Sequence, residues 1–230
     1  MLPKRDKPKF KITIPSSGKS YTYRPYTIGE EKKLLISYET GDFENIIETI
    51  NEVIEDCVEG ISIKDLTYFD FQYIYIKLNM VSSGDMKTVS IKCSECGKDQ
   101  PIDIDLNKIV FSKDLNTSKT IDLNDSIGIT MRYPSMSEFS RAGNDIYSII
   151  STSIENIYDN DTVYNVKDFK QTEIKEWIEK ELLEDDLKKI EAFFKNAPSI
   201  SLDMCEKCLM CGKDSVKLHL DTFEDFFLSP

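Results

Sequence analysis

Apolar and polar residues alternate on both sides of a Ser-Ser-Gly turn near the start of the chain. In the stretch FKITIPSSGKSYTY, Phe10, Ile12 and Ile14 take alternate positions before the turn, and Tyr21 and Tyr23 do so after it. Alternation on both sides of a glycine-containing turn is typical of a β-hairpin. We expect the first three side chains to share one face of the hairpin and the two tyrosines to share another.

Three helices are predicted after the hairpin, where the apolar period lengthens. Thr27 and Glu30 form the pattern of a capping box, and Gly41 ends the first predicted helix. The second begins at Asp42 and carries apolar residues at helical spacing, among them Cys57, which we interpret as a buried core thiol. The third covers LTYFDFQYIYIKLNMVSS, and we interpret its aromatic residues as core, with a partner-binding groove as the alternative.

After Gly84 the apolar period changes to two, and KTVSIKC, DQPIDIDL, TIDL and IGITMRYP are predicted as short strands. PSMSEFSRAGNDIYSIISTSIENIYD, TEIKEWIEKELLE and DDLKKIEAFFKNAP are predicted as helical, with a short strand-like TVYNV among them. SISLDMC and SVKLHLD again have strand character. The pattern predicts an α+β fold with short antiparallel strands. We expect residues 1–133 and 199–230 to build one domain, into which residues 134–198 are inserted as a mostly helical segment.

Two stretches of the chain match each other: KCSECGKD begins at Lys92 and KCLMCGKD begins at Lys207. In a Cys-x-x-Cys-Gly turn, here called a knuckle, two thiolates point to one side and the glycine adopts a backbone conformation that other residues avoid. A structural zinc ion takes four ligands in a tetrahedron, so two knuckles make one zinc-ribbon-like site. The predicted ligands of this structural Zn²⁺ are Cys93, Cys96, Cys208 and Cys211. The knuckle pair is the only internal similarity that we find in the sequence.

Cys205 leaves a second choice of ligands open. CEKCLMC offers three thiols at a spacing of three, and SISLDMC before Cys205 mirrors TVSIKC before Cys93. The shared Gly-Lys-Asp favours Cys208 with Cys211, and Cys205 with Cys208 is the alternative. A thioredoxin-like redox pair needs a helix after the turn, whereas strands are predicted after both knuckles. His219, the single histidine, alternates with leucines, and we interpret it as solvent-facing rather than a ligand.

Charge and composition narrow the classes of function. The 29 Lys and Arg residues against 41 Asp and Glu give a net charge of −12, which disfavours broad attraction to nucleic acid. No apolar run approaches the roughly 20 residues of a membrane-spanning helix. The stretch SSGKS lacks the earlier glycine and the following helix of a phosphate-binding loop. With one histidine and no nucleophile motif, we expect no enzyme activity.

The hairpin ends in Arg-Pro-aromatic, and Glu-Glu-Lys and a leucine-rich helix ending near Gly-Asp follow. These features are carried by Arg24, Pro25, Tyr26, Glu30, Glu31, Lys32, Leu34, Leu35, Gly41 and Asp42. The combination resembles the baseplate hub and hub-assembly proteins of T-even-type contractile-tailed bacteriophages. The resemblance continues through LTYFDFQYIYIKLNMVSSGD, both knuckles, FFKNAPSI and FEDFF.

The resemblance implies a non-enzymatic structural or assembly component of the tail baseplate hub, assembled in the host cytoplasm and located in the virion. It implies contacts with other tail proteins, the spike-hub and tape-measure proteins among them, and an oligomer within the assembly is compatible with it. Neither nucleic acid nor a membrane is expected as a partner. Two alternatives stay open: a transient assembly chaperone absent from the mature virion, and a zinc-ribbon regulator that binds nucleic acid or polymerase.

We expect the contact with other tail proteins to lie at or beside residues 10–42, the part with the most specific resemblance. Tyr21, Tyr23 and Tyr26 stand beside the exposed turn in this segment. The alternative is that these tyrosines cover the protein's own sheet.

Overall fold

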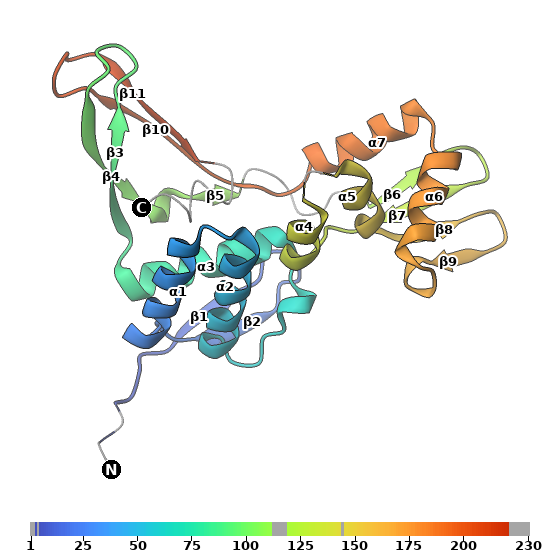
Figure 1. The fold of residues 1–230 in the computed structure, drawn as a ribbon, viewed down its shortest axis with the longest axis horizontal. Helices are drawn as coiled ribbons and strands as arrows, with labels where there is room; N and C mark the ends of the chain where they lie inside the picture. Colours follow the sequence, from blue (N-terminus) through green and yellow to red (C-terminus); the bar gives the residue numbers. More distant parts are fainter. Residues whose placement is uncertain (1–2, 4, 112–118, 144, 221–230) are drawn as a thin grey trace. The chain divides into compact units, whose positions relative to one another are not determined.

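The protein has an α+β architecture of helices and short antiparallel strands (Figure 1), as the sequence predicts. The computed structural model describes residues 3, 5–111, 119–143 and 145–220. Contacts divide the chain into two compact units. Unit 1 consists of Met1–Ile63, Phe69–Ser112 and Ser199–Pro230, and unit 2 consists of Lys64–Tyr68 and Lys113–Pro198.

Residues 10–111 and 200–220 carry the hairpin, the first helices and the long strands. In chain order these elements are β1 (Phe10–Thr13), β2 (Ser20–Tyr23), α1 (Ile28–Thr40), α2 (Phe43–Cys57), η1 (Ile63–Asp65), α3 (Tyr68–Ser83), β3 (Met86–Lys92), β4 (Asp99–Asp105), η2 (Leu106–Lys108), β5 (Val110–Phe111), β10 (Ile200–Lys207) and β11 (Asp214–Leu220).

The predicted hairpin forms, but its side chains are arranged differently from the prediction. β1 and β2 pair antiparallel, with Phe10 opposite Tyr23 and Ile12 opposite Tyr21. Directly opposed residues of an antiparallel pair lie on the same face. The prediction of separate faces for the tyrosines is therefore wrong, because the turn fixes a register that brings them beside the apolar residues of β1. The rings of Phe10 and Tyr23 lie 5.8 Å apart.

The first three helices form where the sequence predicts them. Thr27 and Glu30 make the predicted capping box of α1, and Asp42 caps α2. Along α2 the apolar stripe is buried, and Cys57 at its end is a core thiol that is 1% exposed. α3 buries residues on several sides, as expected of an aromatic core helix. Its carboxylate at Asp70 is fully buried and accepts hydrogen bonds from the Ser16 amide (3.0 Å) and hydroxyl (2.5 Å), which fixes the hairpin turn to the helix.

Unit 2 contains a four-stranded antiparallel sheet in the order β6-β7-β8-β9 together with helices. Its elements are β6 (Thr120–Asp122), β7 (Gly128–Met131), α4 (Met136–Ala142), α5 (Ile146–Ser153), β8 (Ile154–Tyr158), β9 (Val163–Asn165), η3 (Val166–Asp168), α6 (Gln171–Glu181) and α7 (Glu184–Lys195). The core includes Ile129, Met131, Ile150 and Ile190.

One predicted helical stretch of unit 2 ends in a strand. The sequence pattern predicts helix through SIENIYD, whereas Ile154–Tyr158 forms β8 and pairs with both β7 and β9. Ile154 and Ile157 are three residues apart, a spacing that imitates a helix. It arises because a register shift between Thr130 and Met131 interrupts the alternation of residues in the pairing of β7 with β8. The open edge of β7 decides the conformation, a tertiary effect that local pattern does not contain.

Each unit contains a segment in which a strand is followed by an arginine and then by a helix. These two segments, with the elements that follow them, are here called the two copies of a repeat. RPYTIGE begins at Arg24 after β2, and RYPSMSE begins at Arg132 after β7. Arg24 donates to both carboxylate oxygens of Glu30 at 2.8 and 3.0 Å. Arg132 does the same to Glu138 at 2.7 and 2.8 Å. In both cases the intervening Thr or Ser completes a capping box with that glutamate.

In both copies, the end of the second helix accepts a hydrogen bond from the backbone amide of the arginine. After two helices, the Arg24 amide donates to the Cys57 carbonyl at 3.0 Å. The Arg132 amide likewise donates to the Ser153 carbonyl at 2.7 Å. In each copy the chain that leaves the second helix thereby lies antiparallel to the strand before the arginine.

The similarity continues to the knuckles. IKDL at 63–66 and VKDF at 166–169 form the short helices η1 and η3, and α3 and α6 each begin two residues later. A long strand and a knuckle then follow in both copies. The second copy has two additional elements, β9 before η3 and α7 after α6. The chain thus repeats one arrangement of elements, and the prediction that the knuckles are the only internal similarity is incomplete.

Candidate metal centre

Two antiparallel hairpins carry the knuckles at their turns. β3 and β4 pair from Met86 opposite Asp105 to Lys92 opposite Asp99. β10 and β11 pair in the same manner, with a register shift beside the second knuckle. Long regular ladders hold each turn in a fixed place, so each knuckle is presented by a rigid pair of strands.

The two knuckles have the same backbone geometry. The amide of Cys93 donates to the Lys98 carbonyl at 2.9 Å, and that of Cys208 donates to the Lys213 carbonyl at 2.8 Å. The glycine after each second cysteine has a positive φ, 70° at Gly97 and 74° in the second knuckle. Glycine adopts this conformation without the steric cost of a side chain, which explains its place in both turns.

The four predicted thiols lie together at the spacing of a tetrahedral metal site. The sulfur atoms of Cys93, Cys96, Cys208 and Cys211 all lie within 4.8 Å of one another. Cys93 Sγ is 3.8 Å from Cys211 Sγ, and Cys96 Sγ is 3.7 Å from Cys208 Sγ. Zn–S bonds of about 2.3 Å in a tetrahedron place the sulfurs about 3.8 Å apart. A disulfide requires about 2.05 Å, so these are four separate thiols.

Hydrogen bonds between the hairpins hold the two halves of the cluster together. The amide of Ser94, in the first knuckle, donates to the Ser215 carbonyl at 3.2 Å. The amide of Leu209, at the corresponding place in the second knuckle, donates to Gln100 Oε1 at 2.9 Å. Lys213 and Glu95 form an ion pair at 2.5 Å across the same junction. Each knuckle is therefore braced by the strand that follows the other.

Burial gives the cluster an inner and an outer side. The first cysteine of each knuckle, Cys93 or Cys208, is 1% exposed and packs with Ile102 and Val216. The second cysteine of each knuckle is exposed. The thiols thus cap a small apolar core between the hairpins, with the outer pair facing solvent.

The thiols perturb one another's ionisation. The Ser215 hydroxyl, 3.0 Å from Cys93 Sγ, acts together with the backbone amides of Cys96 and Glu95 to lower the pKa of that thiol to about 6. Although the Lys98 amide lowers the pKa of Cys96, burial and the three neighbouring thiols raise it to about 11. Four adjacent sulfurs therefore do not all ionise together near neutral pH, because like charges repel. A bound cation would remove this repulsion and release the protons that remain.

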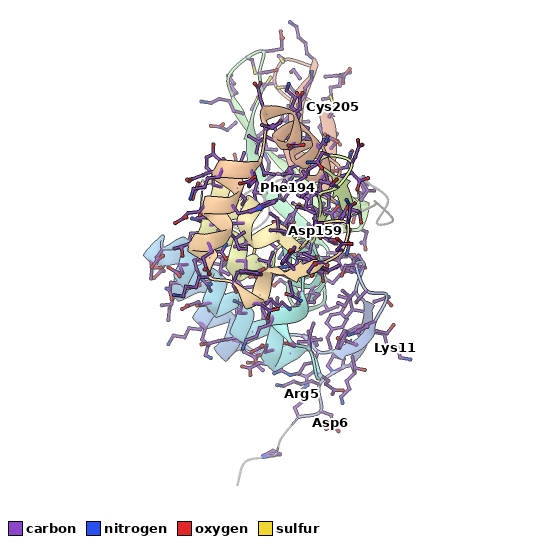
Figure 2. All side chains as sticks on the ribbon, turned by 90° about the vertical axis from the view of Figure 1, so that its right-hand side faces the viewer. Arg5, Asp6, Lys11, Asp159, Phe194 and Cys205 are labelled. Carbon is purple, nitrogen blue, oxygen red and sulfur yellow. The ribbon has the colours of Figure 1, made fainter. Side chains whose placement is uncertain are left out.

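The structure separates the predicted ligands from the alternative. Cys205, labelled in Figure 2, lies on β10 outside the cluster, with an exposed side chain whose sulfur is 3.9 Å from the Asp214 carbonyl. Cys57 belongs to the helical core, where burial raises its pKa to about 12. His219 is exposed, and its Nδ1 lies 2.6 Å from an oxygen of Asp203 on the neighbouring strand.

Sequence reasoning missed the residues that support the cluster. Ser215 and Gln100 are buried polar side chains whose partners lie in the other hairpin. Both occupy the seventh position after the first cysteine of their own knuckle, so a comparison of the two knuckle flanks is the signal that could have pointed to them. Among the described residues, no other group of three or more His, Cys, Asp or Glu side chains lies close enough to hold a metal ion. In that same part of the chain, no helix has the length and apolar character needed to cross a membrane.

Comparison with known proteins identifies the family. A family model described as T4 bacteriophage base plate protein matches residues 7–228. The comparisons with curated proteins and with solved structures gave no match. The family match covers nearly the whole chain and confirms the resemblance to T-even-type baseplate proteins. The chain therefore belongs to the T4 bacteriophage base plate protein family, and it is a structural or assembly component of the baseplate in the virion tail.

Proposed function

We propose that the chain is a non-enzymatic component of the baseplate hub, held in shape by one structural Zn²⁺. It acts by contacts with neighbouring tail proteins, the spike-hub and tape-measure proteins among them. The observation that carries the metal part is the tetrahedral spacing of four thiols from two knuckles. The family match supports interaction with other tail components.

The donor set fits zinc. Four thiolates favour soft or borderline metals such as Zn²⁺ over Mg²⁺ or Ca²⁺, which prefer oxygen ligands. When bound, zinc supplies a closed four-coordinate centre whose binding free energy is coupled to folding. Cys93 and Cys96 would hold it from the first hairpin, and Cys208 and Cys211 from the second. We propose that this link closes residues 1–133 and 199–230 into one domain around the inserted residues 134–198.

Several residues that carry the hub resemblance lie before or in the first turn of α1. Arg24 clamps Glu30 and also donates to the Asp56 carbonyl at 2.9 Å. Tyr26 hydrogen-bonds through its hydroxyl to Asn79 (3.2 Å) and Ser83 of α3. These contacts support the view that Tyr26 stabilises the protein's own fold rather than a partner.

The exposed face of α1 is a better candidate for the contact within residues 10–42. Ile28, Leu35 and Ile36 of α1 are 85, 58 and 52% exposed. Leu35 lies two turns after Ile28 on about the same side of the helix, and Ile36 lies about 100° around the helix from Leu35. Several large apolar side chains exposed on one helix favour a protein interface. We propose that this face contacts another tail protein.

Two measurements test the proposal. Elemental analysis of protein purified without chelators is expected to give one zinc per chain. A zinc-free preparation that is folded would contradict the metal assignment. Mass spectrometry of purified particles is expected to find the chain in mature virions; its absence would favour the assembly chaperone.

A further inference from the structure

An apolar pocket of about 480 Å³ lies within unit 2, between the β8-β9 hairpin and α6. Its lining includes Asp159, Tyr164, Phe169, Glu173, Ile174 and Trp177. The lining therefore combines aromatic and aliphatic side chains with two carboxylates. Large apolar side chains continue onto the surface around it, since Val163, Tyr164 and Phe169 are 68, 40 and 44% exposed.

The repeated arrangement shows what covers the corresponding place in unit 1. Aligned from η1 and η3, the third helical residue is Asp70 in α3 and Glu173 in α6. Asp70 is fully buried and accepts two hydrogen bonds from Ser16 of the preceding hairpin turn, whereas Glu173 is exposed. The same helix face is thus closed in the first copy by a turn that donates hydrogen bonds.

One turn further along, the two copies differ again. Phe71 and Ile74 of α3 are fully buried; of their counterparts in α6, Ile174 is also buried, and the other is Trp177. Trp177 is only half-buried and lines the pocket. The second copy therefore presents, in open form, a face that the first copy fills with its own chain.

The charge around the pocket specifies the chemistry of an occupant. Residues 155–181 contain eight carboxylates and four lysines. Asp159 at the rim accepts hydrogen bonds from the amides of Asp161 and Thr162 and from the Tyr164 hydroxyl, which lower its pKa and keep it ionised. Glu173 accepts a hydrogen bond from the Lys170 amide at 2.7 Å. A partner that presents an apolar side chain with a positive charge beside it would be complementary to this pocket and its acidic rim.

We propose that this pocket binds a short segment of another tail protein that presents a bulky apolar side chain next to a lysine or arginine. The segment takes the place that the hairpin turn takes in unit 1, with its apolar side chain against Trp177 and its cation near Glu173 and Asp159. This inference rests on the proposed function, because it names one kind of partner segment for a protein that works by contacts in the tail.

The test selects peptides without assuming a partner. A random-peptide display library is panned against the full chain, and the enriched peptides are synthesised with a fluorescein label for anisotropy titration. We expect enrichment of an aromatic or aliphatic residue beside Lys or Arg. Trp177→Ala should weaken binding at least about thirtyfold, the effect of losing a central aromatic anchor. Leu183→Ala, which removes an exposed apolar side chain outside the pocket, is the matched control.

Charge is tested separately from shape. Glu173→Gln keeps an acceptor for the Lys170 amide but removes the negative charge, and it should weaken binding several-fold and reduce the salt dependence. Because Trp177 is the single tryptophan, its fluorescence in the wild-type chain should change when a peptide binds.

Several outcomes would overturn the inference. One is that no peptide is enriched, and another is that the enriched peptides share an acidic consensus. A third is that Trp177→Ala and Leu183→Ala weaken peptide binding equally. Sedimentation that shows Trp177-dependent self-association would assign the pocket to a second copy of this chain instead. These outcomes leave the zinc content and the presence of the chain in virions untouched, so failure of this inference can be distinguished from failure of the proposed function.

Discussion

The clamp between Arg24 and Glu30 should make unit 1 sensitive to acid. The Glu30 carboxylate accepts two hydrogen bonds from Arg24, which lower its pKa. Burial raises the pKa, and a hydrogen bond from the Thr27 amide at 2.6 Å lowers it further. The net effect lowers the pKa from 4.5 to about 2. A lowered folded-state pKa means that the ionised form stabilises the fold. The stabilisation is fully present above pH 4.5 and is lost as the pH falls towards 2.

The size of the effect follows from the shift and the exposure of the pair. At about 1.4 kcal/mol per pKa unit, the shift from 4.5 to about 2 corresponds to roughly 3.5 kcal/mol. The Arg24 and Glu30 side chains are 22 and 12% exposed, so solvent screening reduces this to about 1.5–2 kcal/mol. Glu30→Gln should therefore lower the free energy of unfolding by about that amount at pH 7 and by less than half as much at pH 3.

Urea denaturation followed by circular dichroism at pH 7, 5 and 3 measures the difference between variant and wild type. Any effect of low pH on the thiol cluster is common to both proteins and cancels in that difference. Glu31→Gln is the control, because Glu31 is the exposed neighbour of Glu30 and its loss should change stability by less than about 0.5 kcal/mol. Equal effects of the two substitutions at pH 7, or a deficit for Glu30→Gln that is as large at pH 3 as at pH 7, would refute the reasoning.

Three further predictions test other parts of the structure. Cys96→Ser should abolish stoichiometric zinc binding and lower the melting temperature strongly, whereas Cys205→Ser should leave both unchanged; equal zinc content in the two variants would contradict the ligand assignment. Gly128→Ala should destabilise unit 2 by about 1–3 kcal/mol in thermal denaturation, because the added methyl group would lie 2.1 Å from the Tyr158 hydroxyl oxygen; an unchanged melting temperature would show that the ring moves aside freely. Leu35→Asp should keep the melting temperature and weaken co-assembly with hub proteins, and normal co-assembly would move the contact away from α1.

Local features of the sequence predicted the elements and the thiol cluster well. The knuckles could be found because two thiols and the turn glycine lie within five consecutive residues, and because the same pattern occurs twice. Helix caps at Thr27 and Asp42 are equally local. The choice of Cys211 over Cys205 followed from the shared Gly-Lys-Asp, which marks where the turn ends.

Features that depend on contacts between distant segments were not predictable in this way. The face of Tyr21 and Tyr23 depends on a register that alternation alone does not fix. The strand β8 exists because β7 offers it an edge. The braces at Gln100 and Ser215 each require the opposite hairpin to be in place.

The sequence pattern did not reveal the repeat, because the spacing between shared residues differs between its two copies. Arg24 and Arg132 are 108 residues apart, whereas the first knuckle cysteines, Cys93 and Cys208, are 115 apart. Insertions between the shared residues hide the match from any comparison at a fixed spacing. Only the repeated hydrogen bonds, such as those of the two arginines, make the correspondence visible.

The repeat also explains why one chain carries the same knuckle twice. Each copy of the arrangement ends in a hairpin that offers two thiols, which is half of a four-thiolate site. Neither copy can complete the site by itself, so the second hairpin must fold against the first. The braces support this view, because Leu209 of the second copy binds Gln100 of the first and Ser94 of the first binds Ser215 of the second. A metal held there would report that both halves of the chain have folded, since its ligands come equally from each.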